Sequence, residues 1–307
     1  MLGIEAIAVY VPEHQVSNHE LMAKFDVDES FLSEKIGVLQ RAVKGADEDT
    51  SDMALMALEK MIAEKGLARE DIEALVVVTQ NPDSNLPHVS ALVQARAQLS
   101  QDCATFDLSL GCSGYVSGLS VLTAFLASNG LTRGVLITSD PYSKIVNQED
   151  KNTAFLFGDA ATATLIGPNP LLMCGPFVFG TKGDLTGALT CREGELQMNG
   201  REVFNFAATV VPPSVNKLLD KAGMDKEAVD CYIFHQGSRY IVETLGKRLG
   251  LDRDKVRTGM ESTGNTVSSS IPMLLKSELT KPEVKTFVLS GFGVGLSWAS
   301  CLCRRVG

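Results

Sequence analysis

Residues 107–119 of this 307-residue chain read "DLSLGCSGYVSGL", a single cysteine set among glycines and serines. The apolar segment 104–108 leads into it. The segment that follows carries apolar residues at helical spacing as far as Asn129 and Gly130, which are typical of a helix end. The pattern therefore predicts a strand that turns into a helix at Cys112.

The order of elements is repeated once along the chain. Residues 56–80 and 214–236 each show apolar residues at helical spacing, a glycine suited to a helix end, a short acidic stretch and a strand-sized apolar run that ends in glutamine. We therefore expect a duplicated α/β protein with halves 1–167 and 168–307, whose sheets pack against one another with helices between and outside. General similarity among α/β chains is the alternative explanation.

Composition narrows the class of protein. Apolar residues make up 45% of the chain and charged residues 21%, as in soluble globular proteins. The net charge of −9, without a run of lysine and arginine, argues against a nucleic-acid partner. The best apolar run, residues 74–78, is strand-sized, and the N-terminus lacks a basic leader, so we expect no membrane association.

The cysteines indicate a reducing environment. There are seven, an odd number, with no CxxC spacing, and only four histidines accompany them, so a zinc site is not expected. Cys301 and Cys303 lie two apart on an expected strand and share one face, which is more typical of a core than of a metal site. We expect a cytoplasmic protein.

Cys112 is the candidate nucleophile. At the start of a helix, the unpaired N–H groups and the macrodipole stabilise a thiolate. Gly111, Ser113 and Gly114 leave room for a substrate to approach the sulfur. The alternative is a small buried apolar residue, the usual role of a free cysteine, and we assign that role to the other six.

Two more polar residues lie in comparable settings. His235 ends the apolar strand-like segment "CYIFHQGS" (231–238), and Asn265 lies in "STGNTVSSSIP" (262–272), a loop that leads into a helix-like run. Taken singly, a histidine at a strand end is commonly structural and a Gly-Asn pair is commonly a turn. Together with Cys112 they indicate a nucleophile with two polar partners.

These motifs closely resemble those of the beta-ketoacyl-ACP synthase III family. These ketoacyl synthase III-like condensing enzymes belong to the thiolase-like superfamily and start bacterial fatty-acid synthesis. The resemblance runs essentially end to end and includes five motifs in order: "GCSGYVSGL", "FGDAA", "FHQGS", "GNTVSSSIP" and "GFGVGLSWAS". It implies a thiolase-like five-layered αβαβα fold with two pseudo-repeated halves, and a homodimer.

The resemblance also implies a Cys-His-Asn triad of Cys112, His235 and Asn265. Cys112 would take an acyl group from a thioester of coenzyme A or acyl carrier protein, with the oxyanion held by the N–H groups of Cys112 and Val294. A malonyl thioester would then lose CO2, and the resulting enolate, stabilised by the histidine and the asparagine amide, would attack the acyl group. An amide suits this role because a carboxylate would repel the enolate. No metal or organic cofactor is implied.

Substrate-binding positions follow from the same resemblance. Phe31 and Lys151 occupy positions where relatives often hold the adenine of coenzyme A between tryptophan and arginine. Because lysine lacks the planar fork of arginine, we expect weaker adenine recognition or an acyl group delivered on a carrier protein. Leu86 lies where the family places a residue that closes the acyl tunnel across the dimer. Phe157 and Phe292 complete the predicted set.

The helix after His235 carries the predicted carrier-protein docking site. Lys247 and Arg248 occupy positions where relatives bind acidic acyl carrier protein, and the alternative is an ordinary solvated helix face. The segment 182–195 matches a lid beside the acyl pocket that is usually longer, which suggests an altered or more open pocket.

Two other functions remain open. An acyltransferase of the same fold would pass the acyl group to oxygen, nitrogen or a non-malonyl carbon without decarboxylation. A non-catalytic partner subunit would characteristically lose the triad, which this chain keeps. The sequence leaves open the acyl group, the donor, and whether the enzyme serves primary or specialised metabolism.

Overall fold

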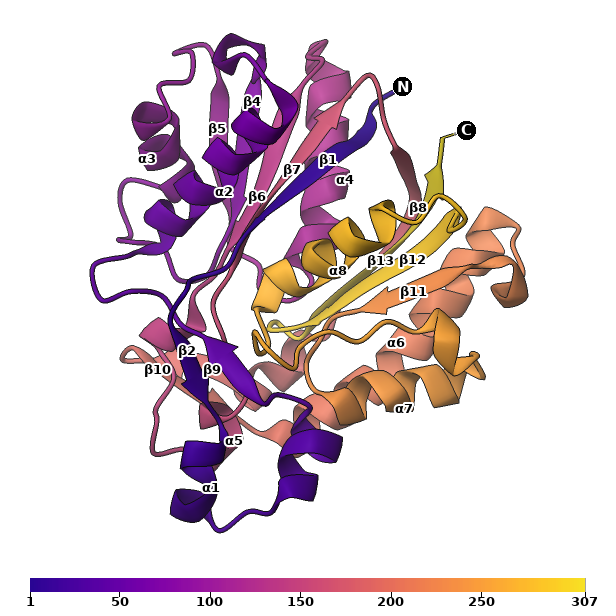
Figure 1. The fold of residues 1–307 in the computed structure, drawn as a ribbon. Coiled ribbons are helices and arrows are strands. Elements are labelled where there is room, and N and C mark those ends of the chain that lie inside the picture. Colours follow the sequence, from indigo (N-terminus) through magenta and orange to yellow (C-terminus); the bar gives the residue numbers. More distant parts are fainter. Residues whose placement is uncertain (307) are drawn as a thin grey trace.

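The computed structural model describes residues 1–306, in which strands and helices alternate along most of the chain (Figure 1). The strands are β1 (Gly3–Tyr10), β2 (Gln15–Ser17), β3 (Gln40–Ala42), β4 (Ala74–Val78), β5 (Ala104–Leu108), β6 (Gly134–Ser139), β7 (Ala161–Gly167), β8 (Leu172–Thr181), β9 (Leu189–Arg192), β10 (Glu195–Met198), β11 (Cys231–Phe234), β12 (Thr286–Gly293) and β13 (Ser297–Arg305). The α-helices are α1 (His19–Phe25), α2 (Thr50–Lys65), α3 (Val89–Arg96), α4 (Gly114–Asn129), α5 (Lys151–Ala154), α6 (Gly200–Ala222), α7 (Arg239–Leu249) and α8 (Ser270–Leu279). Shorter helical turns are η1 (Phe31–Ile36), η2 (Arg69–Asp71), η3 (Tyr142–Lys144), η4 (Gly183–Ala188), η5 (Lys226–Ala228), η6 (Arg253–Lys255) and η7 (Val267–Ser269).

Nine of these strands, in the part of the chain described, form one mixed sheet in the order β5-β4-β6-β7-β1-β8-β13-β12-β11. Its halves are joined at one bridged pair, Ile4 and Leu172. From the junction outward, the first half has the order β1-β7-β6-β4-β5 and the second half has the order β8-β13-β12-β11. Beyond β11, at the position that β5 occupies in the first half, Val256 forms a parallel bridge with Tyr232 of β11. The two pseudo-repeated halves predicted from the sequence are therefore present. The predicted division after residue 167 falls in the connection from β7 to β8.

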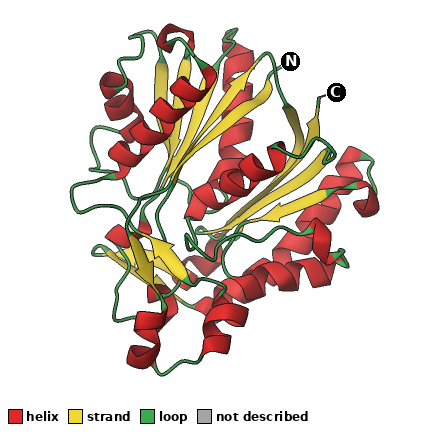
Figure 2. Ribbon diagram, viewed as in Figure 1, coloured by secondary structure: helices red, strands yellow, loops and turns green. Residues whose placement is uncertain are grey.

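The helices form three layers around the two half-sheets (Figure 2). Helices α2 and α3 pack on the outer face of the first half, and α6 and α7 lie outside the second. Helices α4 and α8 lie between the halves and contact strands of both. This is the five-layered αβαβα arrangement that the sequence motifs implied.

Helix α4 fits its central position because it is apolar around most of its circumference, as expected for a helix covered on both sides. Tyr115, Leu119 and Leu122 are fully buried. A Cβ on Gly118 would lie 2.7 Å from the side chain of Leu136, so a glycine permits the close approach of α4 to β6. The start of this helix is thereby fixed beside the carboxyl ends of the parallel strands β4, β5 and β6.

Two small antiparallel sheets, β2-β3 and β9-β10, lie beside the main sheet, near α1 and α5 (Figure 1). The segment 182–195, predicted as a lid, folds into η4, β9 and the first residue of β10. Within residues 1–306, no helix combines the length and the apolar character needed to cross a bilayer.

Candidate active site

A cavity of about 880 Å³ opens where the carboxyl ends of strands from both halves meet. Cys112, His235 and Asn265 all line it, although they come from three segments that are far apart in the sequence. Ligand sites in open α/β sheets commonly lie outside the carboxyl ends of the strands. The cavity is therefore the candidate active site.

Cys112 lies between β5 and α4, two residues before the first residue of the helix, and is only 5% exposed. Strand β12 passes directly over it. A Cβ on Gly291 would lie 2.5 Å from the Cys112 carbonyl oxygen, and a Cβ on Gly293 would lie 2.8 Å from its Sγ. Glycine at these two positions lets the second half of the chain close over the sulfur.

The surroundings of Cys112 favour the thiol over the thiolate. Burial raises the pKa of Cys112 to about 12, and the nearby carboxyl of Asp140 adds to the increase. The backbone N–H groups of Cys112 and Val294 act in the opposite direction and lower the pKa. The expectation that the helix start holds this sulfur ionised is therefore wrong for the protein without substrate, because burial outweighs the nearby donors. A reaction at the sulfur must remove its proton.

His235 follows β11, and its backbone N–H donates to the Ser290 carbonyl at 2.9 Å. The Nδ1 atom lies 2.9 Å from Ser270 Oγ, and the ring meets Phe292 edge to face at 5.6 Å between centroids. Burial lowers the pKa of His235 to about 3, with a smaller opposing effect from the Val267 carbonyl. The imidazole is therefore neutral and has one nitrogen free to accept a proton.

Asn265 is oriented by its own loop. Its Oδ1 accepts a hydrogen bond from the Val267 N–H at 2.9 Å, which leaves the Nδ2 hydrogens for a ligand in the cavity. Val267 has φ of +52°, a left-handed conformation that is unfavourable for a β-branched residue. The Asn265 N–H also donates to the Leu156 carbonyl at 2.8 Å, and the Gly158 N–H donates to the Asn265 carbonyl at 3.1 Å. The site thus presents an amide donor that is held in a fixed direction.

The structure brings four of the five predicted substrate-binding residues to the cavity and leaves one outside it. Phe31, Lys151, Phe157 and Phe292 line the cavity, and Lys151 Nζ lies 5.5 Å from the centre of the Phe31 ring. Leu86 does not line this cavity and is 86% exposed.

The second predicted oxyanion donor, the backbone N–H of Val294, lies close enough to the Cys112 sulfur to lower the pKa of that thiol.

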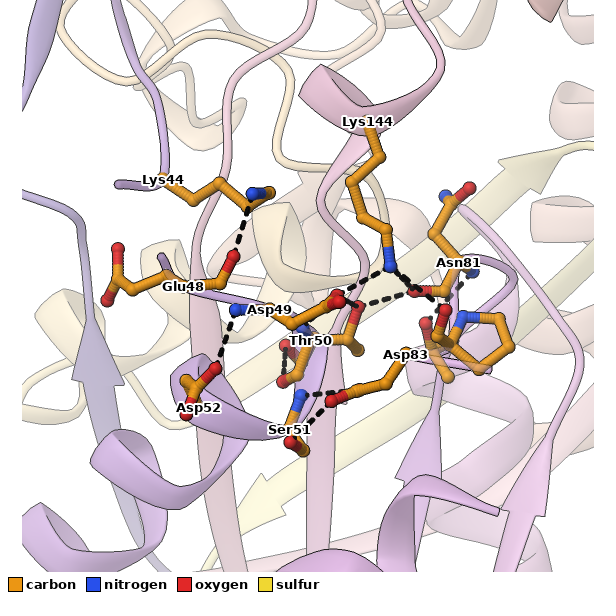
Figure 3. Close-up of polar contacts among 12 residues, drawn as sticks. Lys44, Glu48, Asp49, Thr50, Ser51, Asp52, Asn81, Asp83 and Lys144 are labelled. Carbon is orange, nitrogen blue, oxygen red and sulfur yellow. Dashed lines mark hydrogen bonds and ion pairs between the residues drawn. The ribbon is translucent and has the colours of Figure 1, made fainter. Parts of the chain in front are cut away.

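The loop that carries Leu86 is anchored at its base (Figure 3). Lys144 Nζ donates to the carbonyl of Asn81 at 3.2 Å. The Asp83 carboxylate accepts from the N–H of Ser51 at 2.9 Å and from its hydroxyl at 2.6 Å. These contacts tie the loop to the start of α2, so Leu86 projects from a fixed support.

Lys247 and Arg248 are exposed in the last turn of α7, the helix that begins four residues after His235. Arg248 Nη1 donates to the Ala208 carbonyl on α6 at 3.2 Å, which restrains that side chain. The predicted docking residues therefore lie outside the cavity, on the same helix as the cavity-lining Tyr240.

Sequence reasoning missed several residues at the site. Lys35 and Arg201 also line the cavity and give its wall two further positive charges. Ser270, beside His235, and Val267, beside Asn265, both lie in the quoted "GNTVSSSIP" motif, but nothing in their spacing identified their partners. Within residues 1–306, no three or more His, Cys, Asp or Glu side chains are arranged so that they could hold a metal ion.

Comparisons with known proteins agree over the whole chain. Residues 106–183 match the family model of 3-oxoacyl-[acyl-carrier-protein (ACP)] synthase III, and residues 219–305 match the model of its C-terminal part. The chain is 37% identical to beta-ketoacyl-[acyl-carrier-protein] synthase III 1 of Halalkalibacterium halodurans, over 98% of each chain.

Solved structures give the same result. A beta-ketoacyl-[acyl carrier protein] synthase III from Thermus thermophilus is similar with a TM-score of 0.92 at 31% identity, covering 99% of both chains. A priming beta-ketosynthase from a polyketide biosynthetic pathway is similar with a TM-score of 0.90 at 26% identity, covering 99% of this chain and 96% of the other.

Proposed function

This chain belongs to the 3-oxoacyl-[acyl-carrier-protein] synthase III family, and on that premise we propose that Cys112, His235 and Asn265 are its catalytic residues. The family, the thiolase-like fold and the condensing activity predicted from the sequence motifs are confirmed by the comparisons. The protein is an acyltransferase of the condensing type, which makes a 3-oxoacyl product in fatty-acid biosynthesis. The observation that carries the assignment of residues is the single cavity lined by all three side chains.

In the first step, Cys112 Sγ attacks the carbonyl carbon of an acyl thioester. Because the resting sulfur is a thiol, its proton passes to the neutral imidazole of His235 and from there to the departing thiolate of the donor. The new bond joins the acyl carbon to Cys112, and the bond to the donor sulfur breaks. The N–H groups of Cys112 and Val294 stabilise the oxyanion.

In the second step, the thioester carbonyl of a malonyl group accepts hydrogen bonds from His235 and from the Asn265 amide. Loss of CO2 leaves an enolate on that oxygen, and its carbon attacks the acyl carbonyl. The carbon–sulfur bond to Cys112 breaks, and the released thiolate takes a proton from water. The Ser270 hydroxyl donates to the Val267 carbonyl at 3.0 Å and so accepts from Nδ1–H of His235 in the first step; when Nε2 carries the hydrogen in the second step, the hydroxyl turns and donates to Nδ1. Neither step uses a metal or an organic cofactor.

We place acyl carrier protein on α7, at Lys247 and Arg248, since the relatives are named for that partner and the two exposed side chains lie on the helix that also carries the cavity-lining Tyr240. The Phe31 and Lys151 pair at the cavity wall supports weaker recognition of adenine than a tryptophan and arginine pair. The neighbouring charges Lys35 and Arg201 suit the phosphate of a carrier arm or of coenzyme A.

Reversing both charges on α7 tests the docking site. The variant with Lys247→Glu and Arg248→Glu is expected to raise the KM for malonyl carrier protein by about tenfold, because exposed ion pairs are each worth ~0.2–1 kcal/mol and reversal adds repulsion. The kcat and the rate with small acyl thioesters should not change. Lys65→Glu, an exposed charge on α2, is the matched control. If the KM for malonyl carrier protein were the same in the double variant and in Lys65→Glu, the carrier protein would bind elsewhere.

We also propose a homodimer. Strand β5 forms an edge of the main sheet, and all five of its residues are half-buried, with Phe106 packed on Phe125. An uncovered edge strand is a template for pairing with another chain. The exposed Leu86 would then reach the cavity of the partner.

The unpaired cysteines support a cytoplasmic location.

Release of CO2 separates condensation from simple acyl transfer. The wild-type protein is incubated with malonyl carrier protein and a panel of acyl donors on coenzyme A or carrier protein, and products are read by mass. We expect CO2 and a 3-oxoacyl carrier protein with at least one donor, and neither with His235→Ala. Acyl transfer to another acceptor without CO2 would favour the same-fold acyltransferase, which the comparisons do not favour.

A further inference from the structure

A chain of buried hydroxyl groups runs between the nucleophile loop and the turn after β12. The Oγ atoms of Ser113 and Ser297 are 2.8 Å apart, and Ser297 Oγ donates to the Val294 carbonyl, also at 2.8 Å. Because Ser297 uses its single hydroxyl hydrogen on that carbonyl, it accepts from Ser113. The two serines are 2% and 8% exposed, so water does not replace these bonds freely.

Ser113 occupies the N-cap position of α4 but makes no capping bond with its side chain. Serine at this position usually accepts from the first turn of the helix. Here its hydroxyl is directed to a residue 184 positions away. The bond to Ser297 has therefore taken the place of a local stabilising contact.

The turn held by Ser297 carries one of the two N–H groups next to the sulfur. Gly293 and Ser297 are paired across the start of the β12–β13 hairpin, and Val294 is the first of the three residues between them. Gly295 has φ of +133°, a conformation that side-chain-bearing residues rarely adopt. The turn thus has glycine on both sides of Val294, and the hydroxyl bond to the Val294 carbonyl restricts it.

We propose that Ser297, bridged to Ser113, is a positioning residue that keeps the Val294 N–H aligned with the Cys112 N–H. This inference rests on the proposed function, in which those two groups stabilise the oxyanion. Oxyanion donors act only when they lie about 2.7–3.1 Å from the developing charge, and losing one costs about 10²–10³ in kcat. Ser113, the residue directly after Cys112, makes the link, so that one hydrogen-bonded chain fixes both donors.

The test compares Ser297→Ala with Ser300→Ala. Ser300 is a buried serine on the same strand, and its hydroxyl bonds to Ser290 at 2.8 Å and Ser214 at 3.2 Å, away from the sulfur. The rate of acyl-enzyme formation at saturating donor is followed by intact-mass spectrometry. Ser297→Ala is expected to lower that rate by about tenfold or more without changing the donor concentration at half-saturation. Ser300→Ala should stay within a few-fold of wild type, even if its melting temperature falls equally.

Three further measurements separate alignment from stability. Ser297→Thr keeps the hydroxyl and should restore the rate. Ser113→Ala should also slow acylation, and its effect should not add to that of Ser297→Ala, because both break the same chain. Alkylation of Cys112 by iodoacetamide at fixed pH should slow in Ser297→Ala, since the Val294 N–H lowers the pKa of the thiol.

Equal acylation rates in Ser297→Ala and Ser300→Ala would overturn the inference. If Ser297→Ala does not fold, Ser113→Ala decides: a rate equal to that of Ser300→Ala has the same consequence. Failure of the wild type to form an acyl-enzyme with any donor would instead contradict the proposed function. The two failures are therefore distinguishable.

Discussion

Cys112→Ala is expected to abolish the covalent acyl adduct that the wild type forms with short acyl thioesters. No other group in the cavity replaces the sulfur as a nucleophile, so condensation should fall by about 10⁴-fold or more. Intact-mass spectrometry after incubation with each donor measures the adduct, and product formation measures condensation. The adduct should be lost completely because the covalent intermediate cannot form without the sulfur.

Cys103→Ala is the matched control for this variant. Cys103 is also an unpaired, buried cysteine, and burial raises its pKa to about 11, but it does not line the cavity. The control should keep the adduct and the activity. An adduct on Cys112→Ala, or none on the wild type with any donor, would contradict the assignment of the nucleophile.

A separate alkylation experiment reports the ionisation of the Cys112 sulfur. With a thiol pKa of about 12, the thiolate fraction of Cys112 rises with pH throughout the neutral and mildly alkaline range. Its alkylation by iodoacetamide should therefore accelerate about tenfold per pH unit from pH 7 to 9, with no plateau. A rate that is already constant near neutral pH would show a thiolate held by the helix start, as the sequence alone suggested.

The alternation of strands and helices, and the three residues that we propose as catalytic, could be picked out from the sequence because each lies in a locally recognisable pattern, whereas the layered fold was implied by the family resemblance. The strand–turn–helix pattern around Cys112 depends only on neighbouring residues, and His235 directly follows a strand that is apolar throughout. The repeat of elements was visible as two similar segments, 56–80 and 214–236, and the structure places their strands, β4 and β11, at equivalent positions in the two half-sheets.

The chemistry of the sulfur could not be predicted in the same way. It depends on Gly291 and Gly293, which bring β12 over Cys112 from the other half of the chain and remove the sulfur from water. Local sequence indicated the favourable helix start and gave no sign of this burial. The bond between Ser113 and Ser297 is long-range for the same reason, since nothing in either segment identifies its partner.

Asn265→Asp is expected to separate the two half-reactions. Acylation of Cys112 should stay within a few-fold of wild type, because the first step makes no use of the Asn265 amide. Decarboxylation of malonyl carrier protein and condensation should fall by about 10³-fold or more, since losing one aligned donor costs about 10²–10³ and like charges in a buried cavity also repel. Adduct formation is read by intact mass, and CO2 release by a coupled assay.

The geometry explains why so small a change is expected to have so large an effect. The Val267 N–H already holds Oδ1 of Asn265 at 2.9 Å, and the introduced carboxylate can satisfy that donor equally well. Its second oxygen then takes the place of Nδ2 and points at the enolate oxygen, where it accepts instead of donating. Fold and cavity shape are therefore retained, and the sign of one interaction is reversed.

Asn265→Ala provides the control that isolates the charge. It removes the donor without adding a carboxylate, so its decarboxylation should be slow at every pH. In Asn265→Asp, a protonated carboxyl can donate to the enolate, so activity should recover as pH falls through the pKa of that group, which burial and the neighbouring enolate raise. If the two variants decarboxylate equally at neutral pH and neither recovers in acid, electrostatic repulsion is not the reason for an amide at this position.

If the acylation rate of Asn265→Asp falls as far as its decarboxylation rate, Asn265 serves the first step as well, and the proposed division of roles between the triad members is wrong.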